Sequence, residues 1–490
     1  MVNTTVDNLR SRNEFWKYFF NICQIPHPSG HEAALRQYLQ QSAEKCGLSC
    51  RVDAAGNLAI DRLAAVGCEN YPAAILQAHL DMVPQKAPGV EFDFLHDSIV
   101  PVVEGDWVTT GGKTTLGADD GMGVALAMEL LTDNSLQCGP LRAVFTVSEE
   151  TGLGGAEDID RDFLKADVLL NLDSDQPFTI GCAGGSRLSG AARLPQRAVS
   201  DQYCGVKFHL TGMHGGHSGV DIHLPVGSAC CVINEFLRQL PAVEIAAVQA
   251  GTLHNAIARE AEVTAAIPAG LWENMSAVLD GFNAKLNEIY LPSPGKKITL
   301  SCEKLVSPPP QVLTSEAQVQ LLELWSNLPH GVLETADNAT VTSCNLAVVE
   351  GSAAGEWKFI LLGRSLYDEK RQAMMNDAVC KLQNAGFTAV IDSEYTSWRP
   401  CWDSPLLEFA CRIYKELTNS EAQKTVIHGG LEPGLFCGMN PRLQMLSFAP
   451  LTQSVHSPQE KLNIPDVEKS RVLLRTLLER LNEMPAAQSR

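Results

Sequence analysis

Hydrophobic and polar residues follow two different spacings along this chain. Apolar residues three or four positions apart predict helices from Asn13 to Cys23 and from Glu32 to Cys46, and the run GMGVALAMELL predicts a third. The short apolar runs AAILQAHLD, LRAVFTVSEE and DVLLNLDSD are typical of buried central strands. Strands that alternate with helix-length segments predict central strands of an α/β sheet.

The pattern changes twice further along the chain. Between about residues 186 and 396 the apolar runs alternate more regularly, and the loops PSPGKK and VSPPPQ are rich in proline. After WRPCWDSP the earlier pattern returns, and a closing helix is predicted from about Pro465 to Leu481. We therefore expect a catalytic domain formed by residues 1–185 and 397–490. Residues 186–396 are expected to form an inserted α+β domain that acts as a lid or in dimerisation.

Composition and charge narrow the class of protein. The 490 residues are 45% hydrophobic and 19% charged, which is ordinary for a soluble protein with two or more domains. A formal net charge of −19 repels nucleic acid and anionic membranes, so neither is expected as a partner. The 15 cysteines are scattered, with no CxxC pair, and the first residues lack the pattern of a secretory signal. We expect a soluble cytoplasmic protein.

Acidic residues and histidines collect where the predicted strands end or a helix begins. The residues concerned are His79, Asp81, Asp119, Asp120, Glu149, Glu150, Asp173 and His456. Because the carboxyl ends of neighbouring strands in an open α/β sheet meet at one crevice, these side chains should converge. So many carboxylates share a pocket most economically around metal cations. Asp120 stands just before a predicted helix and is expected to cap it.

Charge arithmetic favours two metal ions over one. If the ligands are His79, Asp119, Glu150, Asp173 and His456, three anionic ligands meet two divalent cations and leave about one positive charge. Imidazole and carboxylate ligands suit Zn²⁺, with Mn²⁺ or Co²⁺ as substitutes. The sequence thus predicts a mixed-sheet catalytic domain with a dinuclear metal site.

The adjacent carboxylates Glu149 and Glu150 are expected to do different work. Neighbouring side chains at the end of a strand point in different directions. Glu150 can therefore bind a metal while Glu149 faces the water between the metals and takes its proton. Two adjacent carboxylates at a strand end usually just face solvent. The residues GLGGA that follow argue against that explanation here.

The ordered motifs HLDMV, GADDG, SEETGLGGA, NLDSD and VHSP resemble the zinc-dependent M20 metallopeptidase family. The segments QAHLDMVPQK, GCAGG, GGHSG, GTLHNAIARE and HGGLEPGLF look like the aminoacyl-histidine dipeptidase branch of that family, also called Xaa-His dipeptidase, peptidase D or carnosinase-like. The resemblance runs over essentially the whole chain. It implies hydrolysis of the peptide bond of unblocked dipeptides, with Xaa-His substrates such as β-alanyl-histidine expected.

The resemblance also implies a role for each matching metal-site residue. His79, Asp119 and Asp173 would hold one zinc, and Asp119, Glu150 and His456 the other, so that Asp119 bridges the two. The carboxylate of Asp81 would orient the ring of His79. Glu149 would act as general base and then as general acid.

The remaining implied roles concern the substrate. His217 in GGHSG would polarise the scissile carbonyl, and Asn255 and Arg364 would hold the substrate. Gly430 and Glu432 in HGGLEPG would line the pocket near the substrate carboxylate. A homodimer is expected, and His217 could serve its own subunit or, as in relatives with a smaller lid, the partner's.

Two alternatives remain open. An N-acyl amino acid amidohydrolase of the same fold would need an apolar acyl pocket in place of an ammonium site. A non-catalytic metal-binding homologue would usually have lost the base or a ligand, whereas Glu149 and all the expected ligands are present. No GxSxG motif occurs, which counts against a serine hydrolase of the α/β type.

Overall fold

The computed structural model describes residues 5–174, 178–336 and 339–485, and it divides into two compact units. Unit 1 comprises Met1–Gly181, Trp398–Val426 and Leu431–Arg490; unit 2 comprises Cys182–Ser397 and Ile427–Gly430. The sequence analysis expected the boundaries at residues 185/186 and 396/397. The return of residues 427–430 to unit 2 was not expected. There the backbone N–H of Ala183 donates to the carbonyl of Ile427 at 2.9 Å.

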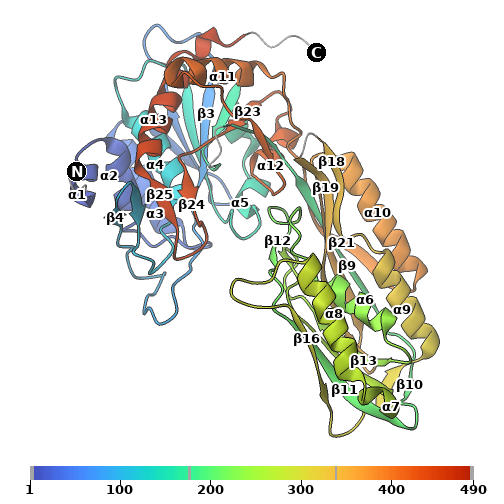
Figure 1. The fold of residues 1–490 in the computed structure, drawn as a ribbon. Helices are drawn as coiled ribbons and strands as arrows, with labels where there is room; N and C mark the ends of the chain where they lie inside the picture. Colours follow the sequence, from blue (N-terminus) through green and yellow to red (C-terminus); the bar gives the residue numbers. More distant parts are fainter. Residues whose placement is uncertain (1–4, 175–177, 337–338, 486–490) are drawn as a thin grey trace. The chain divides into compact units, whose positions relative to one another are not determined.

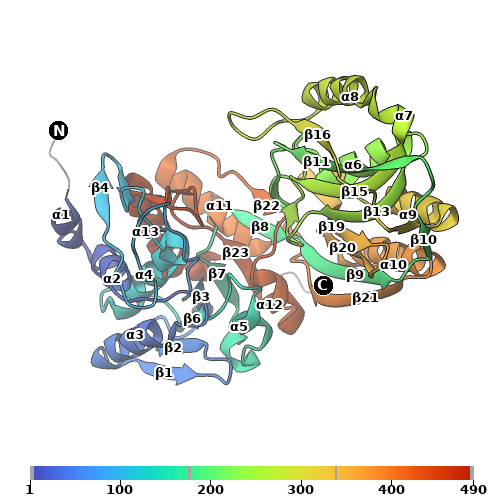
Figure 2. The same ribbon diagram turned by 90° about the horizontal axis from the view of Figure 1, so that it is seen from below.

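A mixed sheet forms the centre of unit 1 (Figures 1 and 2). Its strands, in spatial order, are β1 (Ser49–Val52), β2 (Leu58–Arg62), β6 (Leu141–Thr146), β3 (Ala74–His79), β7 (Val168–Asn171), β23 (Gln444–Ser447), β8 (Thr179–Cys182) and β22 (Thr425–Ile427). The pairs formed by β6, β3, β7 and β23 are parallel, and the pairs β1–β2, β2–β6 and β23–β8 are antiparallel. The sheet therefore joins strands from both ends of the chain.

Helices pack on both faces of this sheet, with α4 and α13 on one side and α5 and α12 on the other (Figure 1). The α-helices of unit 1 are α1 (Val6–Arg10), α2 (Glu14–Ile22), α3 (Ala33–Lys45), α4 (Ala118–Thr132), α5 (Gly154–Glu157), α11 (Pro405–Thr418), α12 (Pro433–Met439) and α13 (Ile464–Glu479). Two 3₁₀ turns are η1 (Arg161–Leu164) and η2 (Leu481–Glu483). The helices predicted near the start and end of the chain correspond to α2, α3, α4 and α13.

Local sequence explains where these helices begin. The side chain of Asn13 accepts a hydrogen bond from the N–H of Trp16 at 3.2 Å and caps α2. Asn463 caps α13 in the same way through the N–H of Asp466, and a proline follows it in the first turn. A smaller sheet of unit 1 contains β24 (Thr452–Gln453), β25 (Lys461–Asn463), β5 (Trp107–Thr109) and β4 (Val102–Glu104).

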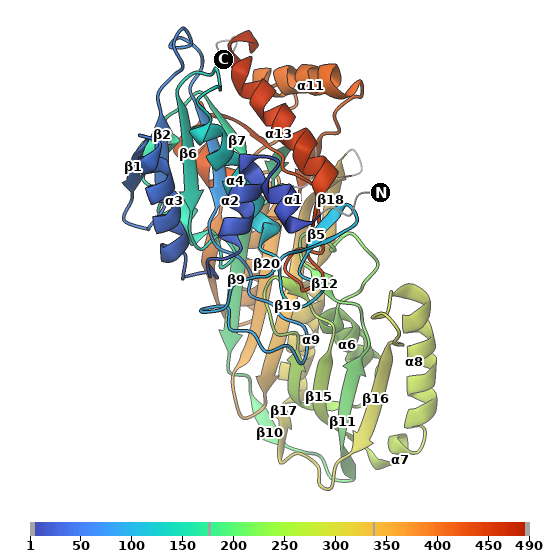
Figure 3. The same cartoon turned by 90° about the vertical axis from the view of Figure 1, so that its left-hand side faces the viewer.

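Unit 2 is built on an antiparallel sheet, part of which is seen in Figure 3. Its strands, in spatial order, are β16 (Thr299–Lys304), β11 (Tyr203–Thr211), β15 (Ala261–Pro268), β13 (Glu244–Ala250), β19 (Ala339–Ser352), β20 (Trp357–Ser365), β9 (Gly184–Ala192) and β21 (Thr388–Tyr395), with β18 (Gly331–Ala336) also paired to β19. Two short ladders join β10 (Gln196–Ala198) to β17 (Gln311–Leu313) and β12 (Gly216–His217) to β14 (Ala256–Ile257).

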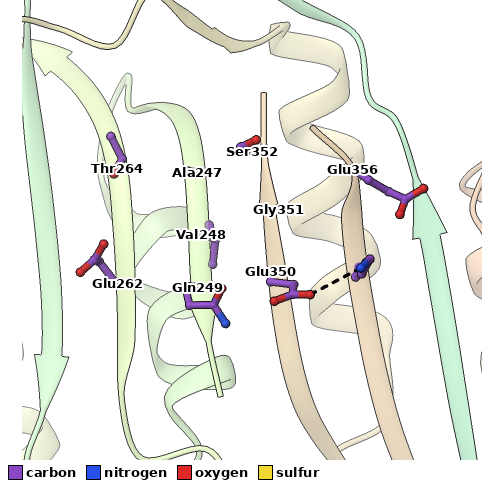
Figure 4. Close-up of a pocket in the computed structure, with 10 residues that line it drawn as sticks. Ala247, Val248, Gln249, Glu262, Thr264, Glu350, Gly351, Ser352 and Glu356 are labelled. Atoms are coloured by element: carbon purple, nitrogen blue, oxygen red, sulfur yellow. Dashed lines mark ion pairs between the residues drawn. The ribbon is translucent and has the colours of Figure 1, made fainter. Parts of the chain in front are cut away.

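Helices cover one face of the unit 2 sheet and leave the other partly exposed. They are α6 (Ala229–Gln239), α7 (Ala269–Trp272), α8 (Met275–Ile289), α9 (Ser315–Asn327) and α10 (Asp368–Asn384). On the open face a shallow hollow of about 430 Å³ crosses β15, β13, β19 and β20. Figure 4 shows Glu262, Gln249 and Glu350 on neighbouring strands of this hollow, where Glu350 pairs with Lys358 at 3.8 Å. No candidate site residue lines it.

The mixed sheet of unit 1 and the separate antiparallel sheet of unit 2 confirm the predicted α/β architecture with an inserted domain. Within the described residues, none of the helices combines the length and the apolar character needed to cross a lipid bilayer.

Candidate metal centre and substrate-binding residues

The predicted metal ligands collect beside three adjacent strand ends of unit 1. β3 lies between β6 and β7 and runs parallel to both, so the carboxyl ends of all three strands meet at one edge of the sheet. His79 is the last residue of β3 and is level with Thr146, the last residue of β6. Glu150 follows β6 and Asp173 follows β7, so a short loop carries each carboxylate to the same edge.

Three side chains form the first candidate metal site. His79 Nε2 lies 3.0 Å from Asp119 Oδ1 and 3.7 Å from Asp173 Oδ1. One ligand atom from each residue lies within 4.8 Å of the others. His79 is only 1% exposed. Its ring is therefore held by its surroundings in one orientation.

A second group of three shares Asp119 with the first. His456 Nε2 lies 3.2 Å from Asp119 Oδ2 and 2.9 Å from Glu150 Oε1. The two oxygens of Asp119 thus face different histidines, which is the arrangement of a bridging carboxylate. His456 has a left-handed backbone (φ 59°), a costly conformation for a residue with a side chain that recurs at functional sites.

These spacings fit two divalent cations. Ligand atoms bound tetrahedrally at about 2.0–2.1 Å from one zinc ion lie roughly 3.3 Å apart. The four distances between histidine nitrogens and carboxylate oxygens run from 2.9 to 3.7 Å. The donor set consists of imidazole nitrogens and carboxylate oxygens, which suits zinc, manganese or cobalt.

Asp119 lies at the start of α4, next to Asp120. Asp119 and Asp120 fall in the first turn of α4 but have non-helical backbone angles, and the peptide bond that joins them is cis. Asp120 accepts a hydrogen bond from the N–H of Gly123 at 3.0 Å, as expected of a helix cap. Asp120 also accepts one from the N–H of His79 at 3.3 Å, so it ties α4 to the end of β3.

Asp81 contacts the ring of His79 through both its backbone oxygen and its carboxylate. The atom nearest to His79 Nδ1 is the backbone oxygen of Asp81, at 2.9 Å, whereas its carboxylate lies 3.5 Å away. A hydrogen bond from Nδ1 to that carbonyl leaves Nε2 to face the metal site. The carboxylate of Asp81 accepts hydrogen bonds from the backbone N–H groups of Glu149 and Glu150 at 2.9 and 3.1 Å and from Ser29 Oγ at 2.7 Å.

The excess of carboxylates makes the centre attract positive charge. Burial raises the pKa of Asp173 to about 7, and the neighbouring Asp119 adds to the effect. Hydrogen bonds to Asp119 and Glu150 raise the pKa of His456 to about 11. The metal-free centre therefore holds protons at neutral pH, and divalent cations would displace them.

Glu149 lies in the same cluster without belonging to either group of three. Its carboxylate forms a further possible ligand set with His79 and Glu150, within 4.8 Å. Burial raises its pKa well above the usual value, and the charges of Asp173, Glu150 and Glu432 act in the same direction. A carboxylate beside the metals with a raised proton affinity can take a proton and return it.

Glu460 is a supporting residue that the sequence analysis missed. Its buried carboxylate accepts hydrogen bonds from four successive backbone N–H groups, those of residues 116–119, at 2.7–3.2 Å. It therefore fixes the loop that carries Asp119. Burial raises the pKa of Glu460 to about 7, and Asp119 contributes. A single glutamate in the loop SVHSPQEKL gives no periodic signal from which this role could be predicted.

Glu432 and Gly430 fall in different units, although they are close in sequence. Glu432 belongs to unit 1, is fully buried, and accepts hydrogen bonds from Thr146 Oγ1 at 2.8 Å and from the side chain of Gln77. Its carboxylate therefore bonds to side chains of β3 and β6 near the carboxyl ends of these strands. Gly430 belongs to unit 2, where its Cα faces the ring of Tyr395.

The predicted residues His217 and Asn255 are neighbours within unit 2. β12 and β14 pair His217 with Ala256, and the N–H of Ser218 donates to the carbonyl of Asn255 at 2.9 Å. Both His217 and Asn255 are exposed. His217 Nδ1 accepts hydrogen bonds from the N–H groups of Val220 and Gly219 at 3.2 and 3.3 Å, which places the ring proton on Nε2.

Arg364 lies at the end of β20 in unit 2 and is only 4% exposed. Its Nη1 donates to the hydroxyl of Tyr395 at 2.5 Å. Among the described residues no carboxylate pairs with it, and its Nε has no hydrogen-bond partner. A buried guanidinium without a counter-ion is costly, so the site is suited to an anion that arrives from outside.

The two overlapping groups of three at the strand ends of an α/β sheet define a dinuclear metalloprotein. The chain belongs to peptidase family M20/M25/M40, whose family model matches residues 75–480. The resemblance seen in the sequence motifs is thereby confirmed.

Individual relatives match over the full length. The chain is 35% identical over 487 residues to the cytosol non-specific dipeptidase of Escherichia coli (strain K12), covering 97% of this chain and 98% of that protein. It superimposes with a TM-score of 0.83 on the crystal structure of aminoacylhistidine dipeptidase from Vibrio alginolyticus, at 32% identity and 99% coverage of both chains. Human carnosine dipeptidase 1, at 11% identity and a TM-score of 0.52 over 98% of this chain and 97% of that one, shares the fold.

Proposed function

We propose that this protein is a metal-dependent dipeptidase that hydrolyses unblocked dipeptides, with Xaa-His substrates including β-alanyl-histidine preferred. The observation that carries the proposal is the pair of ligand groups joined by Asp119, with the carboxylate of Glu149 beside them. The names of the Escherichia coli and Vibrio alginolyticus relatives support the substrate class.

His79, Asp119, Asp173, Glu150 and His456 would hold two divalent cations, most simply Zn²⁺, with Mn²⁺ or Co²⁺ as substitutes. When bound, the cations supply the Lewis acidity that activates water and polarises the scissile carbonyl. Every other step falls to the side chains of the protein.

Glu149 moves the proton. It accepts a proton from the attacking water as the new carbon–oxygen bond forms, and it delivers that proton to the amine as the carbon–nitrogen bond breaks. The high proton affinity that burial gives this carboxylate suits both halves of the cycle. Asp81 holds the backbone of Glu149 in place through the hydrogen bond to its N–H.

Further residues would hold the substrate. His217 would donate from Nε2 to the oxygen that becomes negative on the scissile carbonyl, since its Nδ1 accepts two backbone hydrogen bonds. Arg364 would bind the carboxylate at the end of the dipeptide, because it is buried and lacks an acidic partner among the described residues. Asn255 and Gly430 would complete the contacts to the substrate.

We further propose that the protein works as a cytoplasmic homodimer. The name of the Escherichia coli relative, a cytosol dipeptidase, supports the compartment. His217 would serve either its own active site or that of the partner subunit. Sedimentation of the purified protein tests whether it forms a dimer. Mixing His217→Ala with Glu149→Gln subunits tests which active site His217 serves, because activity restored in the mixture requires His217 to act across the dimer.

The central test combines metal removal with a substrate panel. The protein is stripped with a chelator, checked by elemental analysis, reloaded with Zn²⁺, Mn²⁺ or Co²⁺, and assayed on free, N-acetylated and C-terminally amidated dipeptides. We expect no activity without metal, recovery with metal, and preference for the free dipeptides. Full activity in a verified metal-free preparation would refute the mechanism. Selective cleavage of N-acetylated substrates would identify a deacylase, and two bound metals without any hydrolysis would identify a non-catalytic homologue.

A further inference from the structure

We propose that Tyr395 is a positioning residue for Arg364, and that Gly185 makes their contact possible. The phenol holds the guanidinium in the orientation that receives the substrate carboxylate, without neutralising its charge. The inference rests on the proposed role of Arg364 in the dipeptidase reaction. It adds residues that act through the arginine and do not need to touch the reacting atoms.

Strand order brings the two side chains together. β9 lies between β20 and β21, and Gly185 of β9 is directly opposite Arg364 on one side and Tyr395 on the other. Residues directly opposite in antiparallel strands project from the same face of the sheet. Arg364 and Tyr395 therefore stand on one face, two strand spacings or about 10 Å apart at the backbone.

The glycine between them is required by this contact. A Cβ atom at position 185 would lie 2.5 Å from two ring atoms of Tyr395 and 2.6 Å from its hydroxyl oxygen. The tyrosine ring therefore lies across the Cα of Gly185 to reach Arg364 Nη1, at 2.5 Å. A side chain at position 185 would occupy the path of the ring.

A second glycine bounds the other edge of the ring. A Cβ at Gly430 would lie 3.1 Å from Cε2 of Tyr395 and 3.3 Å from Cζ, closer than most real contacts. Gly430 lies in the HGGLEPG segment that was expected near the substrate carboxylate. The ring of Tyr395 is thus confined between two glycine positions, so its hydroxyl has little freedom to move away from the arginine.

Charge explains why the partner is a phenol. The acidic residues that precede Tyr395 on β21 are engaged elsewhere: Glu394 pairs with Arg371 at 2.7 Å, and Asp392 pairs with Arg187 at 2.5 Å. A carboxylate in place of the phenol would fix the guanidinium equally well but would neutralise it. The neutral hydroxyl accepts one N–H and leaves the positive charge for the substrate.

A selective kinetic effect follows from this arrangement. The Arg364–carboxylate contact forms in the bound substrate and persists through the reaction, so its loss raises KM more than it lowers kcat. A substrate whose carboxylate is replaced by an amide never makes the charged contact. Greater freedom of the Arg364 side chain should therefore slow the hydrolysis of free dipeptides and leave the hydrolysis of their amides nearly unchanged.

The experiment compares Tyr395→Phe, Arg364→Ala, the double variant and the control Tyr203→Phe on a free dipeptide and its C-terminal amide. Phenylalanine keeps the ring between the two glycines and removes only the oxygen. Tyr203 lies on β11, several strands away in the same sheet, and Tyr203→Phe removes the same atom. Among the described residues, none forms a hydrogen bond with the Tyr203 hydroxyl. Thermal unfolding of each variant verifies the fold.

We expect Tyr395→Phe to raise KM for the free dipeptide roughly tenfold, the usual size for a lost hydrogen bond to a charged group, and to change amide hydrolysis less than about twofold. Tyr203→Phe should change neither. Adding Tyr395→Phe to Arg364→Ala should cause no further loss, because the two residues act as one unit.

Two results would overturn the proposal and leave the function standing. One is an unchanged KM in Tyr395→Phe while Arg364→Ala selectively loses activity on free dipeptides. The other is a double variant whose loss of activity is the sum of the losses in the two single variants. Equal losses on both substrates in Arg364→Ala would instead remove the carboxylate role of the arginine and this proposal with it. Metal-dependent dipeptide hydrolysis by the wild-type protein is measured in the same assay and would be unaffected by any of these results.

Discussion

Replacing Asp81 by asparagine should damage both the metal site and the position of the general base. The carboxylate of Asp81 accepts hydrogen bonds from the N–H groups of Glu149 and Glu150 and from Ser29 Oγ, all within 3.1 Å. The side chain of asparagine has one acceptor oxygen, and its NH₂ group cannot accept from a backbone N–H. At least one of the two partly buried N–H groups then loses its partner.

The size of the effect follows from that count. A buried donor left without an acceptor costs about 1–3 kcal/mol, and the remaining bonds weaken because the acceptor is no longer charged. We expect a loss of about 2–4 kcal/mol in the free energy of unfolding of unit 1, which corresponds to a fall in Tm of roughly 5–15 °C. Changes of this kind around metal ligands typically reduce metal affinity about 10–100-fold.

The pH dependence has a definite sign. Burial opposes ionisation of Asp81, but hydrogen bonds with His79, Ser29 and the N–H of Glu149 lower its pKa to about 2. A carboxyl whose pKa is lowered in the folded protein stabilises the fold above its usual pKa near 4, and that stability is lost as the pH falls towards 2. The difference in Tm between wild type and Asp81→Asn should therefore shrink over this range.

Asp133→Asn is the matched control. Asp133 accepts hydrogen bonds from the N–H and Oγ of Ser135 at 2.8 and 2.7 Å and pairs with Arg475. Burial opposes its ionisation, but these contacts also lower its pKa to about 2. Calorimetric zinc titration and thermal unfolding are measured for both variants, and only Asp81→Asn should lose metal affinity. Wild-type zinc affinity and Tm in Asp81→Asn, or equal loss of zinc in Asp133→Asn, would refute the reasoning.

Three further outcomes are expected. Glu149→Gln should keep two metals by elemental analysis while turnover falls about 10³–10⁴-fold, whereas Glu150→Ala should lose metal; loss of metal in the first variant, or turnover within about tenfold of wild type, would contradict the assignment. Glu460→Gln leaves fewer acceptors for the four N–H groups of the loop at residues 116–119 and should weaken zinc binding at least about tenfold, so wild-type affinity would argue against its role. Because the pKa of His456 is raised to about 11 in the metal-free centre by its hydrogen bonds to carboxylates, zinc binding at pH 7 should release protons and strengthen as pH rises; calorimetry in buffers of different ionisation enthalpy that detected no release would disprove this.

The sequence by itself determined the parts of the protein that depend on local pattern. Continuous apolar runs identified β3, β6 and β7, because strands buried on both faces have no polar alternation. The residues at their carboxyl ends could then be named as a group, since parallel strands end at one edge of the sheet. His79, Glu150 and Asp173 do meet there.

Only the tertiary structure decided how these residues are supported. Glu460 accepts hydrogen bonds from residues 116–119 around the start of α4, 342 residues away in the case of Ala118, and no local pattern encodes a contact at that separation. The same limit applies to Asp81, whose type and position were predicted but whose carbonyl, not its carboxylate, lies nearest to the ring of His79.

Strand order was the other feature that the sequence left undetermined. β23, from the last part of the chain, lies parallel to β7, and β9 separates β20 from β21. Periodicity shows which residues of a strand are buried, but the choice of neighbouring strands depends on the packing of the whole chain. The contact between Arg364 and Tyr395 across Gly185 exists because of that choice, so it could be found only in the folded protein.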